Sequence, residues 1–181
     1  MHPRIEELIE HLSKHRRGVH EAVASVPPEL RDRKPAPDRW SVAEVMEHLS
    51  MIEQGVAALL TMHVTTARAN GVGPDPDSSS VVASYANADA LVDRTTKISA
   101  PRRVLPTGTM DAAAGTGALV QAHAAMVSSL QNADGVCLEN LMHPHPVLGS
   151  LNMYHWVVAL GLHDQRHAAQ IREIGQSLAA S

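Results

Sequence analysis

Apolar residues recur at steps of three and four in four long segments of this chain, and that spacing constrains its fold most. The segments cover about residues 5–26, 42–70, 111–133 and 150–178. Such a repeat places the apolar side chains on one face of an α-helix, and this face must be buried against another element. No segment shows a convincing strand pattern. The sequence therefore predicts an all-α protein, a four-helix bundle formed by a single domain covering residues 1–181.

The scarcity of aromatic residues supports this prediction. Aromatic residues make up 2% of the chain and phenylalanine is absent, although hydrophobic residues as a whole make up 44%. The core must therefore consist of Leu, Val, Ile, Met and Ala. This set suits closely packed helices better than a sheet, which favours aromatic and β-branched pairs.

Local signals mark where the second helix begins and ends. Ser41 and Glu44 have the spacing of a capping box, and Trp40 and Val45 occupy the two positions of a hydrophobic staple. The Asn-Gly pair at residues 70–71 is a typical helix terminator. We expect a long helix between these limits.

Proline, glycine and serine residues mark the connections between the predicted helices. Residues 71–110 predict a long, partly irregular connection between the second and third helices. Within it, Asn87–Ser99 is expected to form a short helix with Leu91 and Ile98 facing inward. Residues 142–149 predict a proline-stiffened connection, after which Ser150 is expected to cap the last helix.

Charge and composition exclude several classes of protein. The net charge of −4 and the isoelectric point near 6.3 argue against nucleic acid as a partner, because phosphate binding needs a basic surface. The apolar runs are too short to cross a bilayer, and no signal-peptide pattern is present. A single cysteine cannot form an intrachain disulfide. We expect a cytoplasmic protein that does not bind membranes.

Two of the twelve histidines lie on the apolar stripe of the last segment. His163 and His167 are one helical turn apart between Leu160 and Ile171, so both imidazoles face the core on one side of the helix. Two buried imidazoles need polar partners, and a shared metal ion satisfies both. The competing interpretation is a pair of core histidines satisfied by hydrogen bonds alone.

A third ligand is available on the second helix. His48 lies three residues after Val45 and four before Ile52, at the border of the inner face. If the second and last helices are neighbours, His48 can complete a three-imidazole site that leaves at least one coordination position open. An ion with three neutral ligands keeps its double charge and acidifies a bound water or thiol.

Three further residues are candidates for supporting such a site. Gln170 follows His167 by three residues and can orient it, and Arg166 can hold an anionic substrate. Glu44 can act one turn before His48, although its capping role already explains it. Glu47 is expected to be solvated. The histidines at 143 and 145 are expected either at the mouth of the site or, more simply, in a surface loop.

Two blocks of the sequence are similar to the DinB-like superfamily. The first comprises Trp40–Glu44 and Glu47–Leu49, and the second comprises His145–Gly149, Leu151, Trp156, His163–His167 and Gln170–Ile171. The second block resembles most the branch that includes YfiT-like proteins and bacillithiol transferases.

The resemblance implies a four-helix bundle with a three-histidine site at His48, His163 and His167. It also implies a divalent ion, with zinc or nickel first and iron or manganese as alternatives, and a homodimer. Relatives that are better understood are transferases or isomerases that use low-molecular-weight thiols as co-substrates.

These expectations leave three hypotheses for function. The first is an enzyme acting on a small molecule, either a thiol S-transferase that presents a thiolate at the open position or a hydrolase that presents hydroxide there. The second is a non-enzymatic metal-binding bundle in which the ion joins two helices, in a structural, stress-related or interaction role. The third is a metal-free bundle that acts through its surface.

Overall fold

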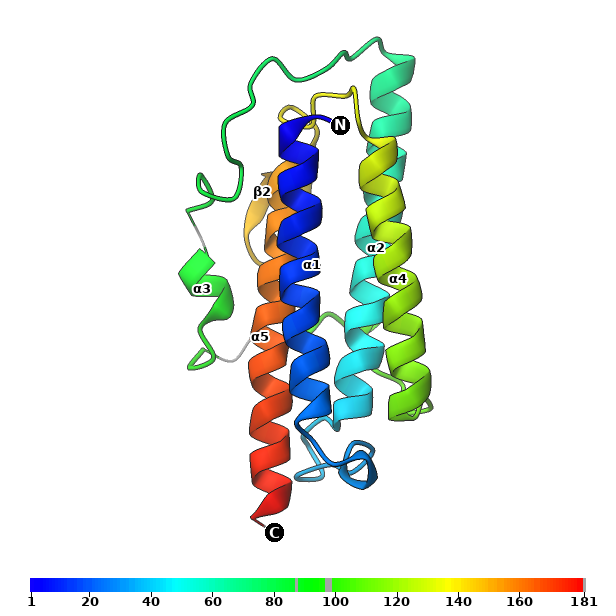
Figure 1. Ribbon diagram of the computed structural model, residues 1–181, viewed down its shortest axis with the longest axis vertical. Helices are drawn as coiled ribbons and strands as arrows, with labels where there is room; N and C mark the ends of the chain where they lie inside the picture. Colours follow the sequence, from blue (N-terminus) through cyan, green and yellow to red (C-terminus); the bar gives the residue numbers. More distant parts are fainter. Residues whose placement is uncertain (87, 97–98, 181) are drawn as a thin grey trace.

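The computed structural model describes residues 1–86, 88–96 and 99–180. In chain order the elements are α1 (Pro3–Ala24), η1 (Pro28–Leu30), α2 (Val42–Ala69), α3 (Ala88–Val92), η2 (Arg102–Val104), α4 (Ala112–Asn132), β1 (Met142–His145), β2 (Gly149–Asn152) and α5 (Met153–Ala179). The four long helices form the predicted all-α bundle. α1 packs along α5, and α2 packs along α4 (Figure 1).

The start of α2 has the local structure that its sequence predicts. The Ser41 hydroxyl accepts a hydrogen bond from the Glu44 amide, and the Glu44 carboxylate accepts one from the Ser41 amide. Val45 is fully buried, and Trp40 packs against the same apolar cluster. α2 ends at Ala69, just before Gly71, whose φ of 75° lies in the left-handed region that favours glycine.

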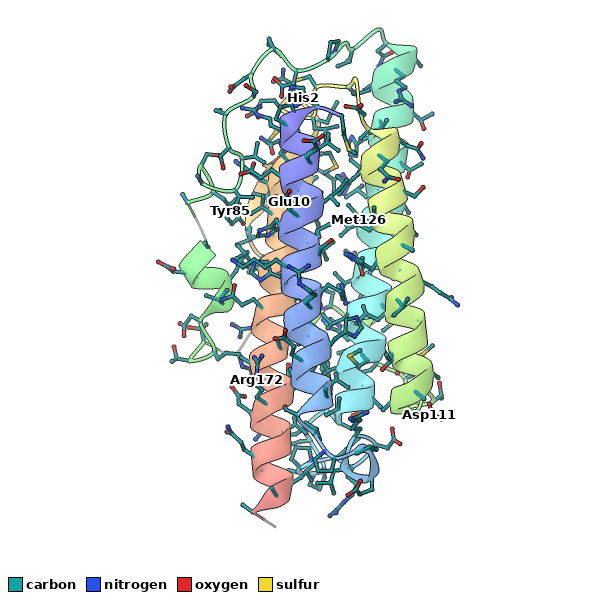
Figure 2. The ribbon with its side chains drawn as sticks, in the orientation of Figure 1. His2, Glu10, Tyr85, Asp111, Met126 and Arg172 are labelled. Carbon is teal, nitrogen blue, oxygen red and sulfur yellow. The ribbon has the colours of Figure 1, made fainter. Side chains whose placement is uncertain are left out.

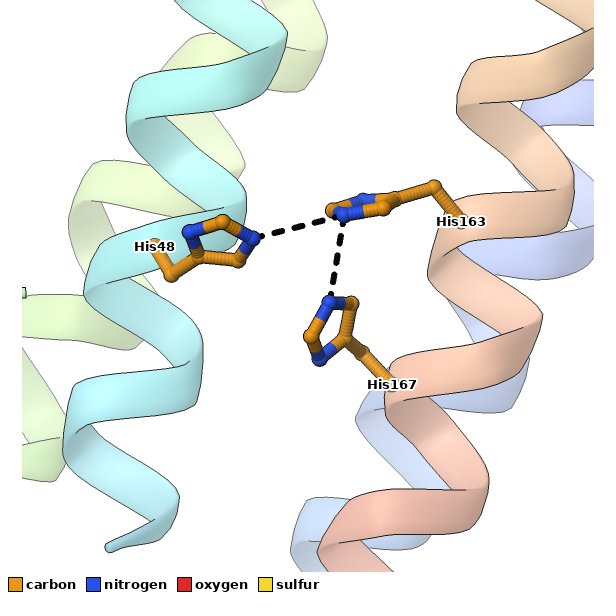
Figure 3. Close-up of side chains that lie close together, drawn as sticks. All are labelled: His48, His163 and His167. Atoms are coloured by element: carbon orange, nitrogen blue, oxygen red, sulfur yellow. Dashed lines mark hydrogen bonds between the residues drawn. The ribbon is translucent and has the colours of Figure 1, made fainter. Parts of the chain in front are cut away.

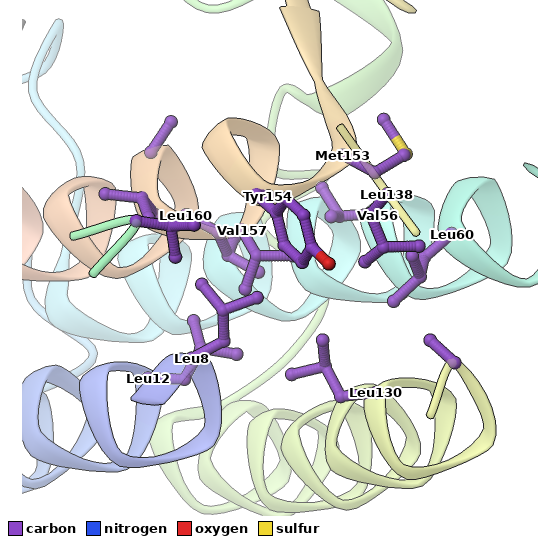
Figure 4. Packing of buried hydrophobic residues seen from close by; sticks show 14 of the residues in the cluster. Leu8, Leu12, Val56, Leu60, Leu130, Leu138, Met153, Tyr154, Val157 and Leu160 are labelled. Carbon is purple, nitrogen blue, oxygen red and sulfur yellow. The ribbon is translucent and has the colours of Figure 1, made fainter. Parts of the chain in front are cut away.

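The core fills the space between the two helix pairs. Figure 4 shows part of its larger cluster, which includes Leu8 and Leu12 of α1, Leu60 of α2 and Leu130 of α4. Met126 is fully buried between the helices, whereas Glu10 and Arg172 lie on exposed outer faces (Figure 2). The side chains that line the core are almost all aliphatic, as the composition predicts.

The connection between α2 and α4 is long and partly irregular. In Figure 1 it crosses the end of the bundle where the chain begins and descends beside α5. Its short helix is briefer than expected and ends at Val92 rather than near residue 99. Leu91 is buried as predicted, while Asn87 and Ile98 lie outside the described residues.

The expectation of a strand-free connection before α5 is wrong. β1 and β2 form an antiparallel hairpin in which Met142 pairs with Asn152 and His145 pairs with Gly149. Packing on α5 stabilises this hairpin, because Leu151 is buried and the Trp156 indole donates a hydrogen bond to the His143 carbonyl. A short hairpin needs such tertiary support, which a local sequence pattern does not reveal.

Because the hairpin occupies residues expected in the last helix, that helix begins later than predicted. Ser150 lies within β2, so the residue that caps α5 is Asn152. Its side-chain oxygen accepts a hydrogen bond from the His155 amide at 2.8 Å. The helix therefore begins at Met153, later than the sequence suggested.

Candidate metal centre

The three predicted histidines meet at one point in the structure. His48 comes from α2, and His163 and His167 come from successive turns of α5 (Figure 3). The Nε2 atom of His163 lies 3.3 Å from Nε2 of His48 and 3.1 Å from Nε2 of His167. Among the described residues, these three form the one group of three or more potential metal ligands whose ligand atoms lie within 4.8 Å of one another.

Hydrogen bonds at the far side of two rings fix which nitrogen is free. Nδ1 of His48 lies 2.7 Å from the Val104 carbonyl, which can only accept, so this nitrogen carries the proton. Nδ1 of His167 lies 2.8 Å from Oε1 of Gln170, which sets the same tautomer. In both neutral rings Nε2 therefore presents a lone pair toward His163.

This arrangement fits a divalent cation. With bonds of 2.0 to 2.1 Å, two nitrogens of a tetrahedral zinc site are about 3.3 Å apart, close to the separations found here. Without a cation, the single ring proton of His163 can satisfy only one of its two neighbours at a time. Nδ1 of His163 is buried and has no hydrogen-bond partner among the described residues. A metal ion can therefore satisfy the three converging imidazole nitrogens better than hydrogen bonds among the rings can.

Burial keeps all three rings in the form that binds metal. The side chains of His48 and His167 are almost fully buried, and this burial lowers the pKa of both. For His163, burial, followed by the proximity of His48, lowers the pKa to about 3. The rings are therefore neutral at physiological pH, as coordination requires.

A large cavity adjoins the cluster. Its volume is about 1110 Å³, and its lining includes five histidines, namely His48, His143, His145, His163 and His167. Trp40 forms part of the wall beside the cluster, with its ring 5.0 Å from that of His48 and 6.3 Å from that of His167. Trp156 lines it near His145, with ring centroids 4.6 Å apart. The cluster is therefore open to a small molecule on one side.

The residues expected to support the site have separate tasks. Gln170 holds His167, as predicted from its spacing. The Arg166 guanidinium lines the cavity but donates to the carbonyls of Leu91, Asp93 and Thr96, so it ties the α3 segment to α5. Glu44 caps α2 and pairs with Lys34 at 2.7 Å.

The expectation that Glu47 is solvated is wrong. Its side chain is buried and accepts hydrogen bonds from the Thr107 amide and hydroxyl and from the Gly108 amide. These bonds lower the pKa of Glu47 against the opposing effect of burial. Glu47 thereby anchors the segment that follows η2, the element whose Val104 carbonyl orients His48. The position of a residue on a helical wheel does not reveal that a loop from a distant part of the chain covers its side chain.

One buried ionic network was not anticipated. Arg16 of α1 lies 2.7 Å from the Glu53 carboxylate of α2 and 3.0 Å from the Asp164 carboxylate of α5. His123 of α4 completes it with a contact of 3.0 Å to Glu53. The signal available in the sequence was an arginine on the apolar stripe of the first helix, four residues after Leu12.

The network joins all four helices next to the histidine cluster. Asp164 follows His163 directly in the chain, and Glu53 lies on α2 beyond His48. Burial, with the nearby Glu53 carboxylate, raises the pKa of Asp164 to about 7, although Arg16 opposes this.

The fold and the cluster together define a class, a four-helix bundle in which three histidines from two helices converge beside a cavity. The family profile of the DinB superfamily matches residues 11–171, and the chain belongs to this superfamily. A relative from Bacillus subtilis strain 168, the uncharacterized protein YuaE, is 26% identical over 156 residues, covering 83% of this chain and 86% of that protein. No solved structure gives a significant match. No helix among the described residues has the length and apolar character needed to cross a membrane.

Proposed function

We propose that this protein is a divalent-metal-dependent enzyme that holds one ion through His48, His163 and His167. The observation that carries the proposal is the position of the cluster, whose three nitrogens converge beside a cavity of about 1110 Å³. An ion held only to join helices needs no such space. Three neutral imidazoles suit zinc or nickel, with iron or manganese as alternatives.

The favoured reaction is transfer of a low-molecular-weight thiol to an electrophilic small molecule. When bound, the ion would lower the pKa of a thiol or water at its open coordination position. The chain's one cysteine, Cys137, is not among the residues that line the cavity, so a thiol nucleophile would come from a co-substrate. Trp40, Trp156 and the aliphatic wall would exclude water from the reacting groups.

A hydrolase is the close variant of this proposal, and product analysis separates the two. The protein, purified without an affinity tag and loaded with zinc or nickel, is incubated with a chlorodinitrobenzene or an activated ester, with and without cysteine or glutathione. A transferase forms a thioether product that requires thiol, whereas a hydrolase releases its product without thiol. His163→Ala should abolish either activity.

The second candidate is a bundle that binds the ion for stability. The positions of the three histidines favour it, because His48 belongs to the α2–α4 pair and His163 and His167 belong to the α1–α5 pair. An ion held by all three would join the two helix pairs. Saturating metal at 100 times its dissociation constant stabilises a folded protein by about 2.7 kcal/mol. Thermal unfolding with and without a chelator measures this effect. A large stabilisation without turnover on any thiol, electrophile or ester would favour the structural role over the enzyme.

A further inference from the structure

A second pair of histidines, one of which lines the same cavity, is not used by the proposed site. His63 of α2 and His143 of β1 approach each other, with Nε2 of His63 3.3 Å from Nδ1 of His143. This separation equals that between His48 and His163 in the three-histidine cluster. His143 lines the cavity, and both side chains are half-buried.

Both rings are carried by ordered elements. His63 lies inside α2, and His143 is paired with Leu151 across the hairpin. The Trp156 indole donates to the His143 carbonyl at 3.1 Å and packs against the His143 ring at a centroid distance of 5.9 Å. Two imidazoles held in this way lose little side-chain freedom when they bind a common partner.

The pair is separate from the three-histidine cluster. His63 follows His48 by fifteen positions in one continuous helix. At 1.5 Å per residue, their backbones are about 22 Å apart along the axis of α2. One ion cannot serve both groups of ligands.

We propose that His63 and His143 form a second binding site for a late first-row divalent cation such as Ni²⁺ or Zn²⁺. Imidazole nitrogen is a preferred ligand for these ions. Partial exposure lets water fill the remaining coordination positions. Burial and the proximity of His143 lower the pKa of His63, which keeps that ring neutral at physiological pH. With two protein ligands instead of three, this site binds more weakly than the cluster at His48, His163 and His167.

Titration with Ni²⁺ alone tests the proposal. Full-length protein without an affinity tag is titrated by isothermal calorimetry and equilibrium dialysis, and the wild type should bind two equivalents with different affinities. His63→Ala and His143→Gln should each remove the weaker equivalent or weaken it at least tenfold, while leaving the tighter one. His155→Ala is the matched control, since His155 contacts the Tyr85 ring and no second imidazole among the described residues. It should retain both equivalents.

A separate variant distinguishes this proposal from the proposed function. His163→Ala should lose the tight equivalent and keep the weak one, with the fold checked by circular dichroism. A single wild-type equivalent that His163→Ala removes, or a second equivalent that survives both His63→Ala and His143→Gln, would overturn the second site. A single wild-type equivalent that survives His163→Ala but is lost in both His63→Ala and His143→Gln would instead contradict the three-histidine site and support the second one.

Discussion

At the scale of single residues, the groups behind the histidines determine the direction in which each ring presents its lone pair. The Val104 carbonyl fixes His48, and the Gln170 amide oxygen fixes His167. Partners of this kind orient a metal ligand and increase its basicity, and their loss typically reduces metal affinity by about 10- to 100-fold. The three rings alone therefore do not describe the site.

Replacing Gln170 with alanine tests this role. Gln170→Ala removes the acceptor for the Nδ1 proton of His167, so zinc affinity should fall by about 10- to 100-fold with little change in helix content. Competition with a chromophoric chelator measures the affinity. Gln165→Ala, at an exposed position of the same helix, is the control and should bind zinc like the wild type. Equal affinity of the two variants would show that Gln170 does not orient the ligand.

At the scale of secondary structure, α1 and α5 pack so closely that one position admits no side chain. The Nε2 proton of His11 is donated to the Val158 carbonyl at 3.0 Å, and a Cβ added at Gly161 would clash with that imidazole. From the sequence, His11 is expected at an exposed or boundary position, yet it is buried and helps to define the spacing of this helix pair.

Two glycine-to-alanine substitutions separate helix propensity from packing. Gly161→Ala should destabilise the protein by about 1–3 kcal/mol, because the buried His11 must move and lose its hydrogen bond. Gly18→Ala should instead stabilise it by up to about 1 kcal/mol, since a Cβ there meets nothing within 4 Å and alanine favours helix. Urea unfolding measures both. The opposite order of stabilities would refute the close approach of α1 to α5.

At the scale of the whole molecule, the network around Arg16 joins the two helix pairs that carry the three clustered histidines. Its guanidinium bridges Glu53 of α2 and Asp164 of α5, and all three side chains are almost completely buried. Buried ion pairs contribute little compared with an apolar replacement, but breaking one leaves an uncompensated charge. The network therefore makes the spacing of α2 and α5 depend on Arg16.

Removing this arginine should be costly. Arg16→Met removes the arginine that pairs with both buried carboxylates, and the free energy of unfolding should fall by about 3–5 kcal/mol. Arg17→Met, at the exposed neighbouring position, should change it by at most about 0.5 kcal/mol. Chemical denaturation of both variants in the presence of a chelator gives the comparison. Similar values for the two would mean that the network does not support the bundle.

The metal-free protein should lose stability as the pH falls below 7. Folding lowers the pKa of His163 to about 3 and of His15 to about 4, so below about 6.5 the unfolded chain binds protons that the folded one excludes. Each such histidine contributes up to about 1.4 kcal/mol per pH unit. Asp164, whose pKa is raised to about 7, has the opposite effect, because between pH 7 and 4 the folded chain binds a proton that the unfolded chain does not. This single carboxyl group offsets only part of the destabilisation caused by the buried histidines.

Urea unfolding at pH 7.5, 6.5 and 5.5 in a chelator measures this dependence. In His163→Gln the number of protons taken up on unfolding should fall by about one, because glutamine does not titrate. The slope of stability against pH should therefore be smaller. Stability that stays constant or rises on acidification from pH 7 to 5.5 would contradict the burial of neutral imidazoles.

The sequence by itself determined the helical class, the four long helices and the shared face of His163 and His167. Spacing along a helix is a local property, so Ser41 with Glu44, and His163 with His167, predicted a cap and a shared face correctly. Only the tertiary structure decided that α2 and α5 are close enough for His48 to join the other two rings. It also decided the burial of Glu47, the hairpin before α5 and the network at Arg16, because each depends on contacts between segments far apart in the chain, which local patterns do not specify.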